Sequence, residues 1–266
     1  MERNADAPQA EELAGELRRA VVSGELTAYF QPVYDLSSRR IVAVEALCRW
    51  NHPKRGVLLP DSFIPVAERY GLIADLGRAM LEDAARRLVG WQRHGVRVGL
   101  ALNVSPSELN PRFAEALLER LGELGLPGAA VTVEITESPA MTATQEERDA
   151  LATLIGGGVG VSVDDFGAGF TSLESLPHLP FTEVKIDRAL MQDGSAEVDA
   201  LVAKCVRIAH ERDAVVVAEG VETEEQLARA IGWGCDRAQG FFFAPALPAS
   251  EVEELLLAAV GNDARA

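Results

Sequence analysis

Short apolar runs rich in β-branched residues recur along the chain, and most of them end in a carboxylate or an amide. Runs of this kind are typical of buried strands. Eight of them can be marked, at residues 27–34, 40–50, 96–103, 130–136, 159–166, 183–186, 214–219 and 238–243. A polar residue that closes a buried parallel strand commonly lies where the sheet opens to a ligand. The pattern therefore predicts one crowded polar opening at the end of a sheet.

Stretches with helical periodicity separate most of these runs. Apolar residues recur every three or four positions within residues 80–91, 113–124 and 198–208. Two helix starts are also indicated. Ser105-Pro106-Ser107-Glu108 combines a cap, a first-turn proline and a capping-box glutamate, and Thr223 with Gln226 repeats the capping box. Eight strands that alternate with helices in about 230 residues predict an α/β fold, a closed (β/α)8 TIM-like barrel.

The first two runs depart from this alternation. Only about five residues separate them, whereas a parallel crossover needs about a dozen residues or more. We therefore expect the first strand to be antiparallel, with a helix over residues 10–23 leading into it. Residues 10–260 are expected to form a single barrel domain, with flexible tails at residues 1–9 and 261–266.

Composition and charge narrow the class of protein. The chain has 266 residues, of which 48% are hydrophobic, and this is enough for a sizeable core. No run reaches the ~18 apolar residues of a membrane span, and the polar N-terminus lacks a signal core. The formal net charge of −16 argues against binding DNA, RNA or an anionic membrane through a basic face. We expect a soluble, cytoplasmic protein.

The cysteines indicate a reducing compartment. Cys48, Cys205 and Cys235 show no metal-ligand spacing, and three thiols cannot all pair. Cys48 lies three residues after Glu45, so two interpretations are open: a redox-sensitive thiol or, as we favour, a plain packed or half-exposed thiol.

Oxygen ligands at several strand ends predict a site for hard divalent cations. Glu45, Asn103, Glu134 and Asp164 would come from four separate strands. The adjacent pair Asp164-Asp165 suits two ions, one bridging and one flanking carboxylate, as in sites that clamp a phosphoryl displacement. Any one of these residues alone is equally explained as a helix cap or a surface carboxylate. Their shared position at strand ends favours the metal site.

Lys185 is the unusual residue of the run Val184-Lys185-Ile186, because lysine is rarely buried without a partner. Either it orients a metal-bound water or neutralises a phosphate, which we favour, or it forms a structural ion pair inside the barrel. The glycine-rich segment 165–170 is expected to shape the site. No histidine falls at a strand end, so direct attack by a metal-activated water is the better chemistry.

Several short motifs follow one another along the chain. They are Gln31-Pro32, Glu45-Ala46-Leu47, Asn103-Val104-Ser105, Glu134-Ile135-Thr136-Glu137, Asp164-Asp165-Phe166-Gly167, Lys185-Ile186-Asp187, Glu219-Gly220-Val221-Glu222 and Gln239-Gly240. Over roughly residues 14–250 they resemble the EAL family of cyclic di-GMP phosphodiesterases. The resemblance implies a barrel with an antiparallel first strand, in agreement with the short first connection. It also implies hydrolysis of cyclic di-GMP to linear pGpG.

The resemblance further implies a role for each candidate residue. The metal ligands, for Mg²⁺ or Mn²⁺ and two ions per site, are Glu45, Asn103, Glu134, Asp164 and Asp165. The catalytic residues are Glu219, Lys185, Asp165 and Glu45, with Lys185 holding the attacking water. The substrate-binding residues are Gln31, Arg49, Gln239 and Glu222, and the residue that anchors the loop after Asp165 is Glu137. Members of the family often form homodimers, and we expect one here.

Two other functions are compatible with parts of this pattern. The first is a cyclic di-GMP receptor that binds without hydrolysis and signals to a protein partner; the complete set of predicted site residues argues against it, because binding alone does not require that set. The second is a barrel enzyme that uses a metal to stabilise an enolate. Such enzymes usually carry an additional capping domain, for which this chain has no room.

Overall fold

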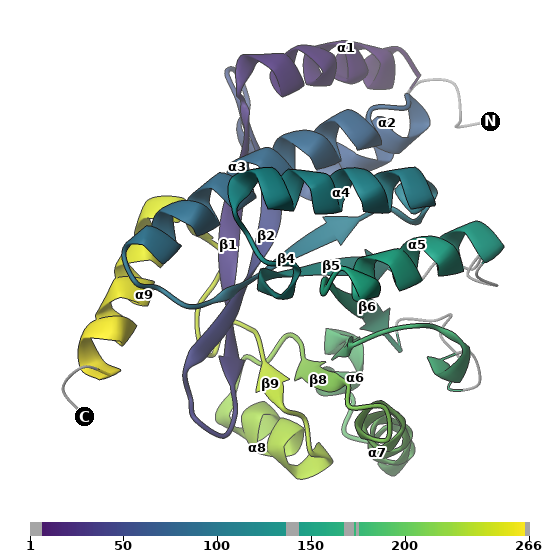
Figure 1. The fold of residues 1–266 in the computed structure, drawn as a ribbon, viewed down its shortest axis with the longest axis vertical. Helices are drawn as coiled ribbons and strands as arrows, with labels where there is room; N and C mark the ends of the chain where they lie inside the picture. Colours follow the sequence, from purple (N-terminus) through teal and green to yellow (C-terminus); the bar gives the residue numbers. More distant parts are fainter. Residues whose placement is uncertain (1–6, 137–143, 168–172, 174–175, 264–266) are drawn as a thin grey trace.

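A closed barrel organises the part of the chain that the computed structural model describes, which is residues 7–136, 144–167, 173 and 176–263 (Figure 1). Within these residues the barrel strands are β1 Leu26–Asp35, β2 Ile41–His52, β4 Gly99–Val104, β5 Val131–Thr136, β6 Gly160–Phe166, β7 Glu183–Ile186, β8 Val215–Ala218 and β9 Arg237–Ala238. The barrel closes because β1 pairs with both β2 and β9. Two short strands, β3 Gly56–Leu58 and β10 Leu247–Pro248, extend the sheet beyond the barrel. The predicted (β/α)8 TIM-like fold is confirmed.

The first strand runs against all its neighbours, as its short connection predicts. β1 is antiparallel to β2 and to β9, whereas the pairings from β2 through β4 to β9 are parallel. The turn between β1 and β2 is stabilised by Asp35, whose Oδ1 accepts hydrogen bonds from the hydroxyls of Ser37 and Ser38, each at 2.7 Å. Arg39 completes the reversal with a positive φ of 58°.

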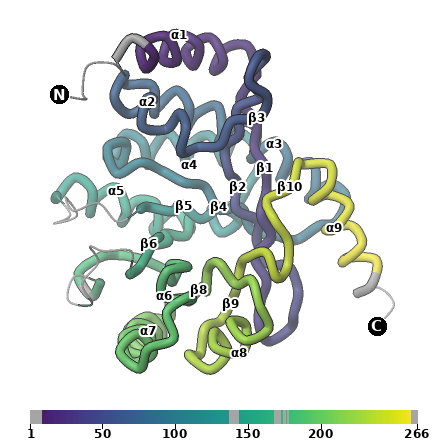
Figure 2. Tube along the Cα trace, turned by 180° about the vertical axis from the view of Figure 1, so that it is seen from behind, coloured from purple at the N-terminus to yellow at the C-terminus, as the bar shows by residue number. Residues whose placement is uncertain are grey.

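Helices lie against the outside of the barrel. They are α1 Ala7–Ser23, α2 Ile64–Arg69, α3 Ile73–Arg93, α4 Pro111–Leu124, α5 Gln145–Gly156, α6 Arg188–Gln192, α7 Ala196–His210, α8 Glu224–Trp233 and α9 Ala249–Asp263. Seen from behind, α1 and α2 lie at the end of the molecule opposite α7 and α8 (Figure 2). Among the described residues, no helix is both long enough and apolar enough to cross a membrane. Helix α1 begins at Ala7 and α9 ends at Asp263, so both helices extend slightly beyond the expected domain limits of residues 10 and 260. Those limits stay a prediction.

The two indicated helix starts have different outcomes. Thr223 and Gln226 form the predicted capping box at the start of α8. At Ser105 the prediction is wrong, since only a single 3-10 turn, Pro106–Glu108, follows it. The Ser105 hydroxyl is hydrogen bonded to Ser107 at 2.9 Å instead of capping a helix. The helix begins later, where Asn110 Oδ1 accepts the N–H of Phe113 at 3.0 Å.

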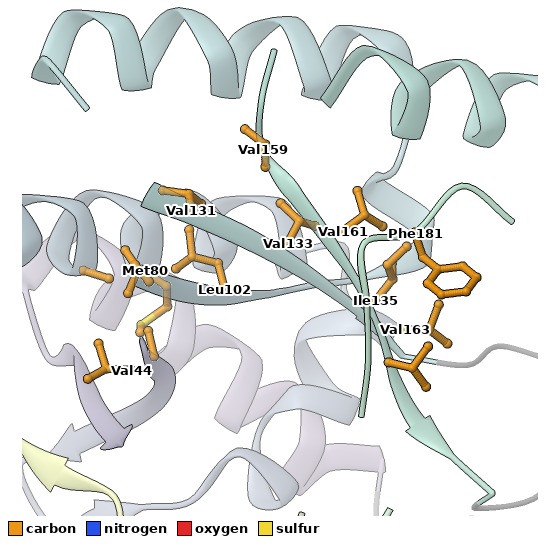
Figure 3. Close-up of a cluster of buried hydrophobic side chains, with 14 of the residues drawn as sticks. Val44, Met80, Leu102, Val131, Val133, Ile135, Val159, Val161, Val163 and Phe181 are labelled. Carbon is orange, nitrogen blue, oxygen red and sulfur yellow. The ribbon is translucent and has the colours of Figure 1, made fainter. Parts of the chain in front are cut away.

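The hydrophobic core lies between the barrel wall and the helices. Along β5, Val131, Val133 and Ile135 are buried in this layer, together with Met80 of α3 (Figure 3). Because consecutive strand residues point to opposite faces, the residues between these three point into the barrel. One of them is Glu134, which is 2% exposed. Strand alternation therefore produces an apolar outside layer and a polar barrel interior.

The last predicted strand is shorter than expected. The run 238–243 is paired only as far as Ala238, because the chain turns at Gly240. The N–H of Val221 donates to Gln239 O at 3.1 Å, and the N–H of Phe243 donates to Gly240 O at 3.1 Å. Gly240 has a φ of +154°, and a Cβ there would overlap backbone atoms of Val221. The strand ends because the backbone at Gly240 lies against that of Val221, and the apolar pattern of the run does not indicate this contact.

Replacing Gly240 with alanine is expected to lower the free energy of unfolding by about 2–3 kcal/mol, because the new methyl group must displace the Val221 backbone. Urea unfolding measures the change. Gly232→Ala is a matched control, since a Cβ at this position of α8 meets nothing within 4 Å. A loss in Gly240→Ala no larger than in Gly232→Ala would contradict the tight approach.

Candidate functional site

Lys185 lies at the centre of a cluster of carboxylates inside the barrel. It is 1% exposed and projects inward from β7. Its Nζ lies 2.7 Å from Glu219 Oε1, 3.1 Å from Glu134 Oε1, 3.2 Å from Asp164 Oδ1 and 3.3 Å from Glu45 Oε2. The predicted convergence of strand-end carboxylates is therefore present in the structure, and one ammonium group contacts four of them.

Amide side chains orient Glu45 within this cluster. Asn103 Nδ2 donates to Glu45 Oε1 at 2.9 Å, and Gln239 Nε2 donates to Glu45 Oε2 at 2.6 Å. Gln239 Nε2 also donates to Gln31 Oε1 at 3.0 Å. Gln31 in turn donates to the carbonyl of Ala244 at 3.1 Å. Asn103 of β4 thus fixes one oxygen of Glu45, and the linked amides of Gln31 on β1 and Gln239 just after β9 fix the other.

Asp165 faces the same side as Asp164 because the backbone is irregular there. The pairing of β6 with β7 shifts register between Val163 and Phe166, and Asp165 has a left-handed φ of 58°. Adjacent residues of a regular strand point to opposite faces, so the bulge is what reorients Asp165. Among the described residues, oxygens of Asp164, Asp165 and Glu219 form a group within 4.8 Å of one another that could hold a metal ion.

The carboxylates repel one another, and this repulsion adds to the effect of burial on their pKa values. Burial, and then the charge of Glu45, raise the pKa of Glu134 well above its usual value. Burial raises the pKa of Glu219 to about 8, and burial together with the charge of Asp164 raises that of Asp165 to about 6. Burial opposes the charged form of Lys185, but the surrounding carboxylates outweigh it and raise its pKa. One ammonium group does not neutralise the cluster, so some carboxyl groups retain protons near neutral pH.

The donor set fits hard divalent cations. Carboxylate and amide oxygens are the ligands that Mg²⁺ and Mn²⁺ prefer. In addition, Gln239 Oε1 is buried and has no hydrogen-bond partner among the described residues, which suits a water held in the cluster. Excess negative charge and an unpaired buried acceptor both favour added cations with their waters.

Without divalent cations, the free energy of unfolding is expected to fall as pH rises from about 5 to about 8. Asp165 and Glu219 have folded pKa values near 6 and 8, above their ordinary values of 3.8 and 4.5, so the folded state binds protons more tightly. That stabilisation is complete below the ordinary values and is lost as pH passes the folded ones. Urea unfolding in EDTA at several pH values measures it.

Two comparisons complete this measurement. Glu219→Gln removes one titrating group and should reduce the fall, and saturating Mn²⁺ should do the same. A free energy of unfolding in EDTA that is flat or rises over this range would show that the raised pKa values are wrong.

A cleft of about 1360 Å³ leads to the carboxylate cluster. Its lining includes Gln31, Glu45, Leu47, Asn103, Asp164, Asp165, Asp187, Arg188, Glu219, Glu222, Gln239 and Phe241, whereas Glu134 and Lys185 are not part of the lining. The predicted residues Gln31, Glu222 and Gln239 thus border one space with the carboxylates. Leu47, Arg188 and Phe241 were not predicted as site residues, because the side chain of an apolar or isolated charged residue does not by itself indicate a ligand contact.

Three sequence expectations have other outcomes. Arg49 does not line the cleft in the described structure; its Nη1 donates to Cys48 O at 2.9 Å and its guanidinium lies over the Tyr29 ring at 5.4 Å. Burial raises the pKa of Cys48 to about 12, which favours the packed-thiol interpretation. Glu137 and segment 168–170 lie outside the described residues.

Comparisons with known proteins agree with this geometry. The family model described as the EAL domain matches residues 14–246. Cyclic di-GMP phosphodiesterase RocR of Pseudomonas aeruginosa is 36% identical over 254 residues, covering 92% of this chain and 65% of RocR. The uncharacterized protein y4lL of Sinorhizobium fredii is 36% identical over 256 residues, covering 95% of this chain and 31% of y4lL. The chain therefore spans less than two thirds of both relatives.

A solved structure shows the same arrangement of the chain. The PaMucR phosphodiesterase in its c-di-GMP complex superposes with a TM-score of 0.84 and 33% sequence identity. The match covers 91% of this chain and 99% of that chain. The likeness thus extends over nearly the whole barrel.

Proposed function

Because the chain belongs to the EAL domain family, we propose that it is a metal-dependent phosphodiesterase that hydrolyses cyclic di-GMP to linear pGpG. The observation that carries this proposal is the group of carboxylates around Lys185, which lies at the inner end of a cleft. RocR, a cyclic di-GMP phosphodiesterase, and the PaMucR phosphodiesterase, solved with c-di-GMP, support the choice of substrate.

The charge of the cluster suits two divalent cations. Its five carboxylates, Glu45, Glu134, Asp164, Asp165 and Glu219, face a single ammonium group, so full ionisation leaves four negative charges. Two Mg²⁺ or Mn²⁺ ions neutralise this charge. We assign one ion to Glu45, Asn103, Glu134 and Asp164, and the other to Asp164 and Asp165. When bound, such ions activate the attacking water and stabilise charge on the phosphoryl oxygens.

The chain's own residues position the reacting groups. Lys185 Nζ and Glu219 Oε1 are in direct contact at 2.7 Å, and together they offer the attacking water a donor and an acceptor on neighbouring side chains. Gln31 and Gln239 fix the orientation of Glu45. In the reaction, water adds to one phosphorus atom and the bond from that phosphorus to O3′ breaks, which opens the ring.

Substrate binding depends on offsetting charge. Cyclic di-GMP carries two phosphodiester charges, whereas the chain has a formal net charge of −16. Bound cations would offset the excess negative charge of the cluster and allow an anion to approach. Gln31, Arg49, Gln239 and Glu222 are our proposed substrate contacts; for Arg49 this requires its guanidinium to leave the Cys48 carbonyl.

Chromatography of cyclic di-GMP incubated with the purified protein tests the proposal, in parallel samples with Mg²⁺, Mn²⁺ and EDTA. We expect pGpG to form with the divalent ions and to be absent with EDTA. Intact cyclic di-GMP that nevertheless binds tightly would overturn the hydrolase and leave the receptor function. No observation on the described residues favours a receptor over an enzyme.

A homodimer remains a prediction. Size-exclusion chromatography with light scattering would measure a mass near 57 kDa for a dimer, about twice the 28.5 kDa of the chain. A mass equal to that of one chain at micromolar concentration would contradict it.

A further inference from the structure

A second ion pair lies inside the barrel, directly beneath the carboxylate cluster. Glu183 precedes Lys185 on β7 by two positions, and Arg237 precedes Gln239 by two positions. Residues two apart on a strand share a face, so this pair points into the same interior, one layer deeper. Arg237 Nη1 lies 2.9 Å from Glu183 Oε2, and Glu183 is 8% exposed.

Strand register places Glu183 close to the cluster. Ser162 of β6 is paired with Glu134 on one side and with Glu183 on the other, so only one strand separates the two glutamates. Neighbouring strands lie ~4.8 Å apart. Burial raises the pKa of Glu183, the charges of Arg237 and Lys185 oppose that rise, and the charge of Asp164 adds to it. Burial is also the main cause of the raised pKa of Glu134, to which the charge of Glu183 makes a smaller contribution.

The charge of Arg237 therefore determines whether the negative charge of Glu183 next to the cluster is neutralised. Paired with Arg237, Glu183 adds no net charge, so the five carboxylates, once fully ionised, and Lys185 carry the four excess negative charges that two divalent ions would neutralise. An unpaired Glu183 would be a further carboxylate competing for Lys185 from below. An unpaired Arg237 would be a second cation competing with the metal ions. The Arg237 side chain is 29% exposed and that of Glu183 is 11% exposed, and a partly exposed ion pair of this kind is weak evidence for a role in stability.

We propose that Glu183 and Arg237 are positioning residues that set the charge beneath the metal site and keep Lys185 directed toward the carboxylates above it. The proposal rests on the proposed function, because it assumes that the cluster binds divalent cations. If the proposal is right, removing the charge of one of the two residues changes the affinity for the metal ion. Removing both charges leaves the net charge, and therefore the affinity, close to that of the wild type.

The experiment is a titration of the substrate-free protein with Mn²⁺, in which electron paramagnetic resonance measures the free ion. Glu183→Gln leaves Arg237 unpaired near the site and should weaken Mn²⁺ binding by about fivefold to tenfold. The double variant Glu183→Gln/Arg237→Gln should return to within about twofold of the wild-type affinity. Glu211→Gln is the control, since its ion pair with Arg207 is an exposed i,i+4 contact on α7.

A charge effect and a structural effect give opposite results in the double variant. If the pair only supports the fold, the double variant will bind Mn²⁺ no better than Glu183→Gln, and this outcome overturns the inference. Wild-type affinity in Glu183→Gln also overturns it. Thermal unfolding of each variant shows whether it is folded. A wild-type protein that binds no Mn²⁺ would instead reject the metal site of the proposed function.

Discussion

Replacing Glu45 with alanine is expected to lower the turnover of cyclic di-GMP in Mn²⁺ by about 10³-fold or more. Both oxygens of Glu45 are in use: one accepts from Asn103, and the other accepts from Gln239 and lies 3.3 Å from Lys185. The substitution removes a proposed metal ligand and also releases the three groups that this ligand orients. Chromatographic measurement of kcat and of the Mn²⁺ dependence tests the prediction.

A matched control separates this effect from a general loss of acidic charge. Glu115 is exposed on α4, and Glu115→Ala should retain wild-type turnover. Glu45→Gln preserves the shape of the side chain but not its charge and should be nearly as inactive as Glu45→Ala. Near-normal turnover in Glu45→Ala would remove Glu45 from the site.

Lys185→Met is expected to lower the free energy of unfolding in EDTA by about 3–5 kcal/mol and to abolish turnover. Methionine fills a similar volume but leaves four carboxylates buried around a neutral side chain. Uncompensated buried charge is the dominant cost, and partial protonation of the carboxyl groups limits it. Urea unfolding in EDTA measures the free energy of unfolding of the metal-free protein, and urea unfolding in Mn²⁺ measures that of the metal-bound protein.

Added Mn²⁺ should restore part of the stability of Lys185→Met but none of its turnover. The ions replace the missing positive charge, whereas the donor that holds the attacking water is still absent. Lys204→Met is the control, because Lys204 is exposed on α7. If unfolding in EDTA is the same for Lys185→Met and Lys204→Met, the lysine does not balance the cluster.

Much of the barrel and of its site could be predicted because strand alternation is local. The run around Glu134 shows why: three apolar residues face the helices, and the carboxylate between them must face the interior. The short connection after β1 likewise restricts that strand to an antiparallel pairing. A pattern within about ten residues is enough to predict the inward position of Glu134 and the antiparallel pairing of β1. The order of the motifs along the chain then indicates the family.

The parts that were missed depend on contacts between distant residues. The strand at Ala238 ends early because Gly240 lies against Val221, and nothing in the apolar run records that approach. Asp165 joins Asp164 on one face only through a bulge, which the dipeptide itself does not reveal. Glu183 and Arg237 are 54 positions apart, so their pairing required the closed barrel.

The antiparallel first strand has a consequence for how the barrel is made. β1 pairs with β2 through a short turn, and hairpins of this kind form within microseconds. Its other edge pairs with β9 through Tyr34 and Ala238, which are about 200 positions apart. At ribosomal rates of roughly 5–20 residues per second, β9 is synthesised on the order of 10–40 s after β1, and this edge of β1 is unpaired until then. Closure of the barrel thus depends on the C-terminal part of the chain, and until that part is made the second edge of β1 is open to pairing with other chains.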